Sequence, residues 1–338
     1  MAETQRKATT RKASFYKMTG ADQLEIRFTH HYAEAVRLRD NGYEPIECAF
    51  GQHGSVLGAL QMDHHGLESH REGVAIRACR DHYGARQADP RFVVTGSPDA
   101  DAVLAIIGLA GLVPKNMLQP SLYELVDAHD RDPIGMNLLA SADGLKLMWF
   151  NQLTGLVQSE GGFRVAIDQM CTLLEDRLSP EVLQAVSKAD RGRRRAAWRG
   201  IVACYDEAGN SLKPPEGDDD APVVRGAQAI EHPVRAMVVN SAVWGFDQWY
   251  RIAPIVVSYS TRLEKVTIGC PDESTAKVLL GSNGLMAVWA QLGKGWGGRP
   301  SIGGSPRGEP FTLKDAHGAA HVVVRIASNH LAASPEDH

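Results

Sequence analysis

The sequence lacks the features that mark secreted and membrane-spanning proteins. Its cysteines are few, far apart and without a CxxC pair, so we expect reduced thiols rather than a disulfide framework. The longest apolar run, AVLAIIGLAGLV, is too short to span a bilayer. The polar and basic start, MAETQRKATTRKAS, contains no apolar segment and does not read as a signal peptide. These absences predict a cytoplasmic protein with no membrane partner.

A strong excess of charge of either sign is also missing, and so are several familiar catalytic motifs. The formal net charge is −4, which gives no bulk electrostatic argument for a nucleic-acid partner. The basic stretch 188–199 has no aromatic residue besides Trp198, so nucleic acid longer than short oligonucleotides is not expected to bind. No Walker A, G-x-S-x-G or dinucleotide-binding fingerprint is present. A small anionic substrate remains open.

Strand and helix patterns alternate in the first half of the 338-residue chain. Strands are expected at 24–29, 44–50, 55–62 and 91–96, and helices at 30–42, 67–83 and 99–113. This alternation predicts an α/β fold with βαβ units, in which a mostly parallel, doubly wound sheet carries helices on both faces.

The second half has a different pattern. Helices are expected at 163–178 and 180–199, followed by a surface loop at 211–222 and a smaller α+β domain whose last strand is 321–327. The expected organisation is a disordered tail at 1–20, an α/β metal-binding domain at 21–160, a helical connector at 161–230 and a substrate-binding domain at 231–338.

Polar side chains follow each expected strand of the first half. Gln52 and His53 follow the second strand, and the candidate site residues at the other strand ends are His30, His31, Asp63, His64, His65, Asp99 and Asp101. Ligands of parallel α/β sheets bind beyond the carboxyl ends of the strands. We therefore expect these side chains to share one edge of the sheet.

Several of these residues have the chemistry of metal ligands. Two carboxylates separated by one residue, Asp99 and Asp101, can converge on a hard cation, and imidazole suits Mn²⁺, Fe²⁺ or Zn²⁺. The same two acids could equally cap the helix that they precede. A turn at Gly66 would let both His64 and His65 serve, but a solvated loop is the alternative.

Further acids lie on the segment 122–135, where Asp127 and Asp130 share one helical face. They could supply the additional carboxylates of a two-metal site, or they could lie at an exposed helix end.

The glycine-rich segment 293–308 is a candidate anion-binding loop. Successive glycines let backbone N–H groups approach an anion, and arginine adds bidentate contacts. The candidates for substrate binding are Gly297, Gly298, Arg299, Ser305 and Arg307. Glycines that only permit turns are the alternative.

Three of these motifs together resemble the DHH phosphoesterase superfamily. They are DHH after an apolar strand, PDADA before an apolar helix, and the Gly-Gly-rich segment near the C-terminus. The resemblance implies a parallel-sheet domain, a smaller C-terminal substrate-binding domain, and a dinuclear centre, with Mn²⁺ as the expected metal, that hydrolyses phosphodiester or phosphoanhydride bonds. The implied substrate is a small anion or a short nucleotide-like molecule, and a homodimer is compatible with it.

The resemblance also implies roles for individual residues. Metal ligands would be Asp63, His64, Asp99 and Asp101, with Asp127 or Asp130 as a further acid. His65 and Asp63 would be catalytic, with His65 facing the substrate. The chain departs from the family in motif order, because its DxD follows DHH, and in carrying Thr95 and Arg299 where histidines are expected. His30 or His31 would then supply the missing imidazole.

The sequence therefore predicts a metal-dependent hydrolase of the phosphoesterase type with a metal-bound hydroxide as nucleophile. Two alternatives remain open. One is a related hydrolase that cleaves a bond without phosphate, and the other is a catalytically decayed protein that binds a small anion and has a regulatory role.

Overall fold

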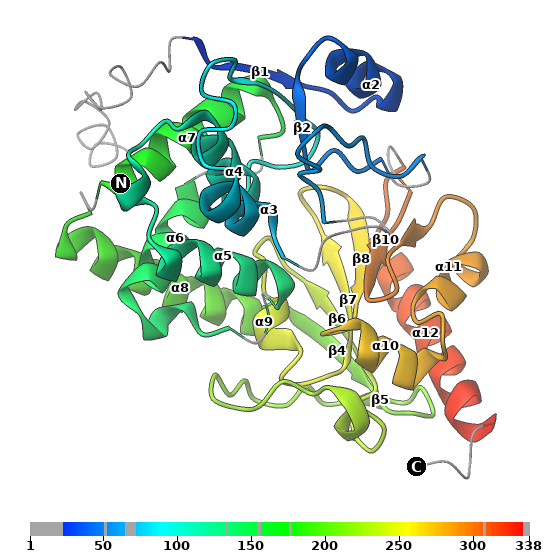
Figure 1. The fold of residues 1–338 in the computed structure, drawn as a ribbon. Helices are drawn as coiled ribbons and strands as arrows, with labels where there is room; N and C mark the ends of the chain where they lie inside the picture. Colours follow the sequence, from blue (N-terminus) through cyan, green and yellow to red (C-terminus); the bar gives the residue numbers. More distant parts are fainter. Residues whose placement is uncertain are drawn as a thin grey trace. The chain divides into compact units, whose positions relative to one another are not determined.

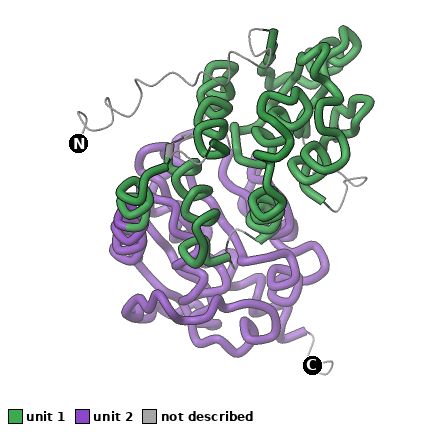
Figure 2. The backbone as a smooth tube through the Cα atoms, turned by 60° about the vertical axis from the view of Figure 1, so that its left-hand side comes forward, with its two compact units in different colours: residues 1–187 green, residues 188–338 purple. Residues whose placement is uncertain are grey.

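The computed structural model describes residues 23–50, 53–64, 72–132, 134, 136–153, 157–175, 178–306 and 309–333 (Figure 1). The expected tail at 1–20 lies outside them. The chain forms two compact units, unit 1 at 1–187 and unit 2 at 188–338 (Figure 2). The division falls inside helix α8 (Pro180–Arg199), within the segment expected to be a helical connector.

Unit 1 contains a three-stranded sheet in which all strands are parallel. Its order is β1 (Glu25–Phe28), β3 (Arg91–Val94) and β2 (Glu44–Ile46). Helix α2 (Tyr32–Asp40) follows β1 and ends before Gly42, whose φ of 90° suits a glycine. The α/β class is confirmed. A doubly wound parallel arrangement is not, because the described parallel sheet has three strands and the larger sheet of the chain is mostly antiparallel.

The strand expected at 55–62 is wrong. Its described residues make two isolated bridges, a parallel one from Met62 to Ile46 at the end of β2 and an antiparallel one from Ser55 to Ala49. The N–H of Leu60 donates to the Glu44 carboxylate at 3.0 Å instead of to a strand, and Gln61 adopts a φ of 52°. A left-handed residue interrupts the extended backbone that a strand needs. The Met62 bridge nevertheless brings Asp63 and His64 to the carboxyl end of β2.

The core of unit 1 is built around helix α4 (Ala100–Ala110), every residue of which is buried. It packs against α3 (Val74–Ile76), α5 (Pro120–Arg131), α6 (Ala142–Leu153) and α7 (Glu160–Leu174). Apart from Asp101 its residues are apolar on all sides, which explains this central place, since a helix that is apolar all round is a buried helix. The start of α4, which carries Asp99 and Asp101, is thereby fixed inside the unit.

The helix expected at 67–83 is shorter than predicted within the described residues. Helix α3 continues as a π-helical turn, η3 (Arg77–Asp81). Residues 65–71 lie outside the described part of the chain. Two 3₁₀ turns, η4 (Lys115–Met117) and η5 (Leu138–Ala140), complete the described elements of unit 1.

Unit 2 is an α+β unit with a seven-stranded sheet of order β5-β4-β6-β7-β8-β10-β9, in which only β6 and β7 pair in parallel. The strands are β4 (Ile201–Tyr205), β5 (Ser211–Leu212), β6 (Ala236–Asn240), β7 (Ile255–Ser260), β8 (Lys265–Gly269), β9 (Gly297–Gly298) and β10 (Ile302–Gly304). The helical elements are η6 (Gly226–Ala229), α9 (Phe246–Trp249), α10 (Glu273–Leu280), α11 (Met286–Leu292) and α12 (Leu313–Ala333).

The strand expected at 321–327 is also wrong, because these residues lie inside the long helix α12. The β-branched run HVVVRI favours a strand locally. The buried residues, however, recur at helical spacing: Ala316, Ala319, Ala320, Val323, Val324 and Ala327. This stripe packs on β6 and β7, and tertiary burial outweighs the local preference.

All five cysteines are buried and free of disulfides, as expected. Among the described residues, no helix is both long and apolar enough to cross a membrane.

Candidate metal centre

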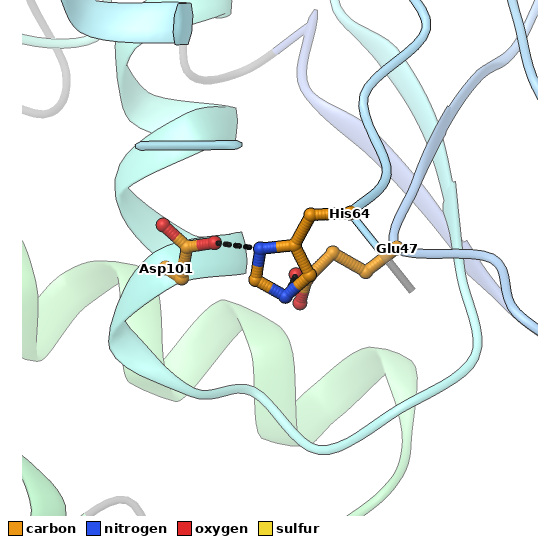
Figure 3. A group of neighbouring side chains, drawn as sticks. All are labelled: Glu47, His64 and Asp101. Carbon is orange, nitrogen blue, oxygen red and sulfur yellow. Dashed lines mark ion pairs between the residues drawn. The ribbon is translucent and has the colours of Figure 1, made fainter. Parts of the chain in front are cut away.

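Side chains from three separate segments of unit 1 meet beyond the carboxyl end of β2. Glu47 directly follows β2, His64 follows the Met62 bridge, and Asp101 lies in the first turn of α4 (Figure 3). One ligand atom from each of these three residues lies within 4.8 Å of the other two. Carboxylate oxygens and an imidazole nitrogen at this spacing form a donor set that can hold a divalent cation.

His64 is at the centre of this group. Its Nε2 lies 3.2 Å from Glu47 Oε1 and 3.2 Å from Asp130 Oδ2, and its Nδ1 lies 3.8 Å from Asp101 Oδ2. The imidazole is 13% exposed, whereas Glu47 is 9% and Asp101 2% exposed. Both ring nitrogens therefore face carboxylates in a largely dry environment.

Glu47 is held in an uncommon conformation. Its φ of 51° is left-handed, a region that side chains other than glycine seldom adopt. Its N–H donates to the Met62 carbonyl at 2.8 Å, which fixes the turn. Burial and the nearby charges of Asp99, Asp101, Asp130 and Asp63 raise the pKa of Glu47 well above its ordinary value. Backbone strain combined with clustered buried carboxylates is typical of functional sites.

Asp101 also has a structural role at the start of α3. Its two oxygens accept hydrogen bonds of 2.9 Å from the N–H groups of Val74 and Ala75. The neighbouring Asp127 accepts from the N–H of Gly73 at 2.6 Å and pairs with Arg131. The two acids thus satisfy N–H groups that a helix start leaves open. Burial raises the pKa of Asp101, and these backbone donors and His64 act in the opposite direction.

Gly73 is required where these two acids meet. A Cβ on it would lie 2.8 Å from Asp101 Oδ1 and 3.0 Å from Asp127 Oδ1. The carboxylates approach the backbone more closely than any side chain would permit.

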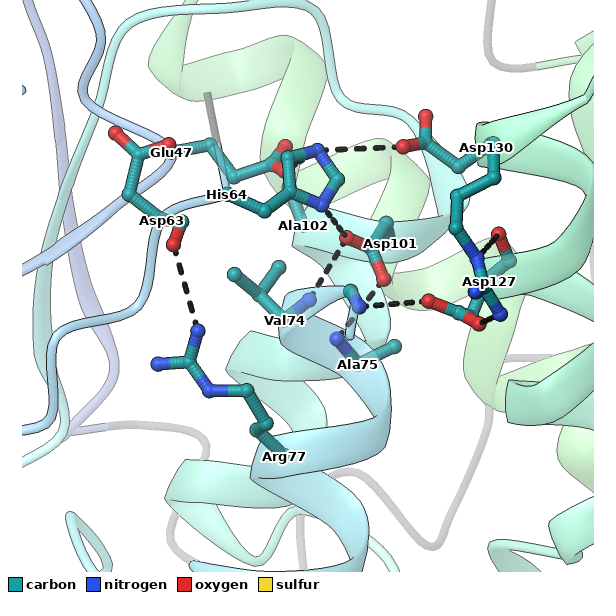
Figure 4. A network of polar contacts seen from close by, with 12 residues as sticks. Glu47, Asp63, His64, Val74, Ala75, Arg77, Asp101, Ala102, Asp127 and Asp130 are labelled. Carbon is teal, nitrogen blue, oxygen red and sulfur yellow. Dashed lines mark hydrogen bonds and ion pairs between the residues drawn. The ribbon is translucent and has the colours of Figure 1, made fainter. Parts of the chain in front are cut away.

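Arg77 fixes the loop that carries Asp63 and His64 (Figure 4). Its buried guanidinium, at the start of the π-helical turn, donates to the carbonyls of Leu60, Gln61 and Asp63. Arg77 therefore compensates for backbone groups that a strand would have paired, and it positions the ligands through their backbone.

A cavity of about 200 Å³ adjoins the cluster in unit 1. Its polar walls include Asp99, Asp101, His129 and Asp130, and its apolar part includes Leu147. Asp99 also caps α4 by accepting from the N–H of Ala102 at 2.9 Å, so the capping alternative is confirmed for Asp99. Burial lowers the pKa of His129, which favours its neutral, metal-binding form.

Two predicted ligands lie away from the Glu47 group. His30 and His31 are both exposed, and neither belongs to a three-ligand group among the described residues. The His30 ring packs edge-on against Phe28 with centroids 4.7 Å apart, and His31 precedes α2 without a side-chain capping bond. Of the residues predicted at the strand ends, Asp63, His64, Asp99 and Asp101 lie together, whereas these two histidines do not. Asp130, predicted separately as a further acid, joins them.

The predicted catalytic residue His65 lies outside the described residues, and so does Arg307. The second predicted catalytic residue, Asp63, is buried beside Glu47 (Figure 4).

The remaining predicted substrate-binding residues lie in unit 2, at a sheet edge. Gly297 and Gly298 form β9, and a Cβ on Gly298 would lie 2.2 Å from the Cα of Gly303 in β10. The N–H of Arg299 donates to the Ile302 carbonyl at 2.7 Å, which closes the hairpin, and its side chain is exposed. Ser305 accepts from the N–H of Val266 at 3.2 Å. These glycines thus permit a tight strand pairing.

Glu47 is the residue that the sequence interpretation missed. It was read as part of the strand 44–50, and its left-handed φ leaves no sequence signal. A charged residue within the otherwise apolar run PIECAF was the one available indication.

Comparison with known proteins identifies no relative: no family model matches the chain, and neither a curated protein nor a solved structure matches it.

Proposed function

We propose that unit 1 is the metal-binding part of a hydrolase of the phosphoesterase type. The observation that carries the proposal is the convergence of Glu47, His64 and Asp101 from three segments, with ligand atoms within 4.8 Å of one another.

The donor set fits a cation because the buried carboxylates repel one another when no cation lies between them. The carboxylates of Asp99, Asp101, Asp130 and Asp63 all raise the pKa of Glu47 in a buried setting. Bringing a divalent ion among them would replace repulsion by attraction and lower that pKa. Imidazole in the set favours Mn²⁺ over Mg²⁺, and Zn²⁺ and Fe²⁺ are also compatible.

The arrangement has room for a second ion. Asp101 belongs both to the Glu47–His64 group and to the wall of the adjoining cavity, where it is accompanied by Asp99, Asp130 and His129. A carboxylate shared between two such positions is a common feature of two-metal sites, whose ions lie about 3.5–4 Å apart. We therefore propose two Mn²⁺ ions, which Asp101 would help to hold together with the Glu47–His64 group and the acids of the cavity.

The ions and the protein side chains would have different roles in hydrolysis. When bound, the ions would supply an activated water at neutral pH and neutralise charge on the transferring group. Asp101, held by Val74 and Ala75, would keep its position throughout. Asp130 is 40% exposed, so it is the acid of this group that solvent reaches most readily.

A phosphoester or phosphoanhydride substrate is proposed from the chemistry of such sites and from the DHH-like residues. Of these, Asp63, His64, Asp99 and Asp101 lie in or beside the cluster. Membership of the DHH superfamily, with a small anionic or short nucleotide-like substrate, is part of the same proposal.

The test uses full-length protein stripped of metal, reloaded with Mn²⁺ and offered pyrophosphate, bis-p-nitrophenyl phosphate, linear dinucleotides and cyclic dinucleotides. We expect Mn²⁺-dependent hydrolysis of at least one substrate, and a loss of roughly 100-fold in His64→Ala, since even outer-shell changes at metal sites cost 10–100-fold. His30→Ala is the matched control because His30 is an exposed histidine outside the group.

Two outcomes would replace the proposal with its alternatives. Bound Mn²⁺ with no hydrolysis of any phosphate substrate would favour a different scissile bond. Failure to bind any divalent ion would favour a decayed site that serves small-anion binding.

A further inference from the structure

A cavity of about 370 Å³ in unit 2 is lined by helix α12 and by the turn that follows β4. The helix contributes His321, Arg325 and Asn329, which recur at intervals of four residues and therefore share one face of α12. The turn contributes residues 207–209. All of these residues belong to unit 2, whereas the proposed hydrolase site is built from residues of unit 1.

The polar side chains that α12 contributes are hydrogen-bond donors. Nη2 of Arg325 donates to Gln291 Oε1 at 3.3 Å, and this bond uses one of the several N–H groups of the guanidinium. Asn329 adds an amide NH₂ group, and His321 adds an imidazole N–H. A wall with a permanent positive charge and neutral donors on both sides of it suits an anion.

The imidazole of His321 is positioned by contacts with β4 and with the turn. Its ring lies against the ring of Tyr205, with centroids 4.7 Å apart. Its Nδ1 faces Gly209, because a Cβ on this glycine would lie 3.8 Å from Nδ1. Gly209 has a left-handed φ of 81°, and its N–H donates to the Asp206 carbonyl at 3.1 Å, which closes the turn beside the imidazole.

The two acids of the turn interact with other groups. Oε2 of Glu207 lies 3.9 Å from Nη2 of Arg235, so the charge of this buried arginine offsets the charge of Glu207. The Asp206 carboxylate accepts hydrogen bonds of 2.7 and 3.0 Å from the N–H and the side-chain amide of Asn210, and these bonds lower the pKa of Asp206. The positive charge of Arg325 is therefore available to a ligand.

The spacing of the donors indicates an elongated ligand. His321 and Asn329 are about 12 Å apart along the axis of α12, and Arg325 lies midway between them. A single phosphate group on Arg325 is too short to contact both of the other donors. Two linked phosphates, or a phosphate joined to another polar group, can reach further along the helix.

We propose that this cavity binds a small, elongated molecule that carries a phosphate group. The planar fork of Arg325 would bind two oxygens of that group, and His321 and Asn329 would bind the polar groups on either side. The site does not depend on the proposed hydrolase activity.

The test is a calorimetric titration of metal-free, full-length protein with pyrophosphate, since the acids of unit 1 repel anions when no metal is bound. We expect one equivalent to bind, more tightly than inorganic phosphate or the dicarboxylate succinate. Arg325→Ala should weaken the affinity roughly tenfold or more, and Arg325→Lys should weaken it less because the charge remains. Arg299→Ala is the matched control because its side chain is exposed and lies outside the cavity.

Chemical labelling locates the ligand independently of affinity. Phenylglyoxal modifies exposed arginines, and pyrophosphate should protect Arg325 but not Arg299 when the modified residues are identified by mass spectrometry. Arg325 is exposed, so its variants should fold normally. Absence of pyrophosphate binding, equal affinity in the wild type and Arg325→Ala, or protection of Arg299 alone would overturn the proposal. Succinate binding as tight as pyrophosphate binding would overturn the assignment to phosphate.

Discussion

Glu47 Oε1 and His64 Nε2 lie 3.2 Å apart, although the two residues come from different segments of the chain. Glu47 adopts a left-handed φ of 51° at this position. The parallel bridge between Ile46 and Met62 brings their backbones together, and Arg77 holds the carbonyls on the His64 side. The relationship is therefore determined by backbone geometry and not by the two side chains alone.

Two substitutions of Asp99 should distinguish its role as the cap of α4 from its proposed role as a metal ligand. Asp99→Asn keeps the oxygen that accepts from Ala102, so stability should change by no more than a few tenths of a kcal/mol, whereas Asp99→Ala should lose about 1 kcal/mol. Both variants should lose occupancy of the second ion, because neither retains the carboxylate. Chemical denaturation and metal analysis check this, and full occupancy in Asp99→Asn would show that Asp99 is a cap only.

Arg77 should be essential for stability. Arg77→Met would leave the carbonyls of Leu60, Gln61 and Asp63 without their donor, at a cost of about 3 kcal/mol or more in the free energy of unfolding. Arg77→Lys keeps the charge but not the fork of donors, and it should cost less. Urea denaturation measures both. A loss below about 1 kcal/mol in Arg77→Met would mean that Arg77 does not fix the loop.

Gly73→Ala should disturb both buried acids. The added methyl would collide with the carboxylates of Asp101 and Asp127, which are already committed to backbone N–H groups. Overpacking of this kind costs about 1–3 kcal/mol. The Mn²⁺ affinity should fall as well because Asp101 is displaced. Gly96→Ala is a suitable control, since its Cβ would meet no atom within 4 Å; equal losses in the two variants would contradict the crowding at Gly73.

Because Glu44 is buried, we expect the free energy of unfolding to depend on pH. Burial raises its pKa, so the folded protein holds this proton more strongly than the unfolded chain does. The stabilisation that protonated Glu44 contributes is fully present below the pKa that Glu44 has in the unfolded chain. It is lost as the pH rises through the raised pKa that Glu44 has in the folded protein. Glu44→Gln keeps an oxygen for the N–H of Leu60 and should become increasingly more stable than the wild type as the pH rises from 4 to 7. A constant or falling difference in urea denaturation would contradict this assignment.

Much of unit 1 could be predicted from sequence because its signals are local. The apolar helix that begins within PDADA, the strand before it and the glycine after α2 all lie where expected. The carboxyl end of β3 brings Asp99 to the site as expected. Asp63 and His64 also lie there, but through the isolated bridge of Met62 to Ile46 and not through a strand.

The errors arise where distant contacts determine local structure. The run HVVVRI favours a strand, but the alanines before it give α12 a face that packs on β6 and β7. The segment 55–62 has the composition of a strand, but the Glu44 carboxylate and Arg77 bind its backbone instead. Glu47 was missed for a similar reason, because its conformation depends on the Met62 carbonyl.

The most direct test of the metal centre is a Mn²⁺ titration of metal-free, full-length protein, followed by electron paramagnetic resonance of the free ion. The wild type and His30→Ala should bind Mn²⁺ with the same affinity, and Glu47→Gln and His64→Ala should each bind at least tenfold more weakly. Equal binding by the wild type and His64→Ala would show that Glu47, His64 and Asp101 do not form the site.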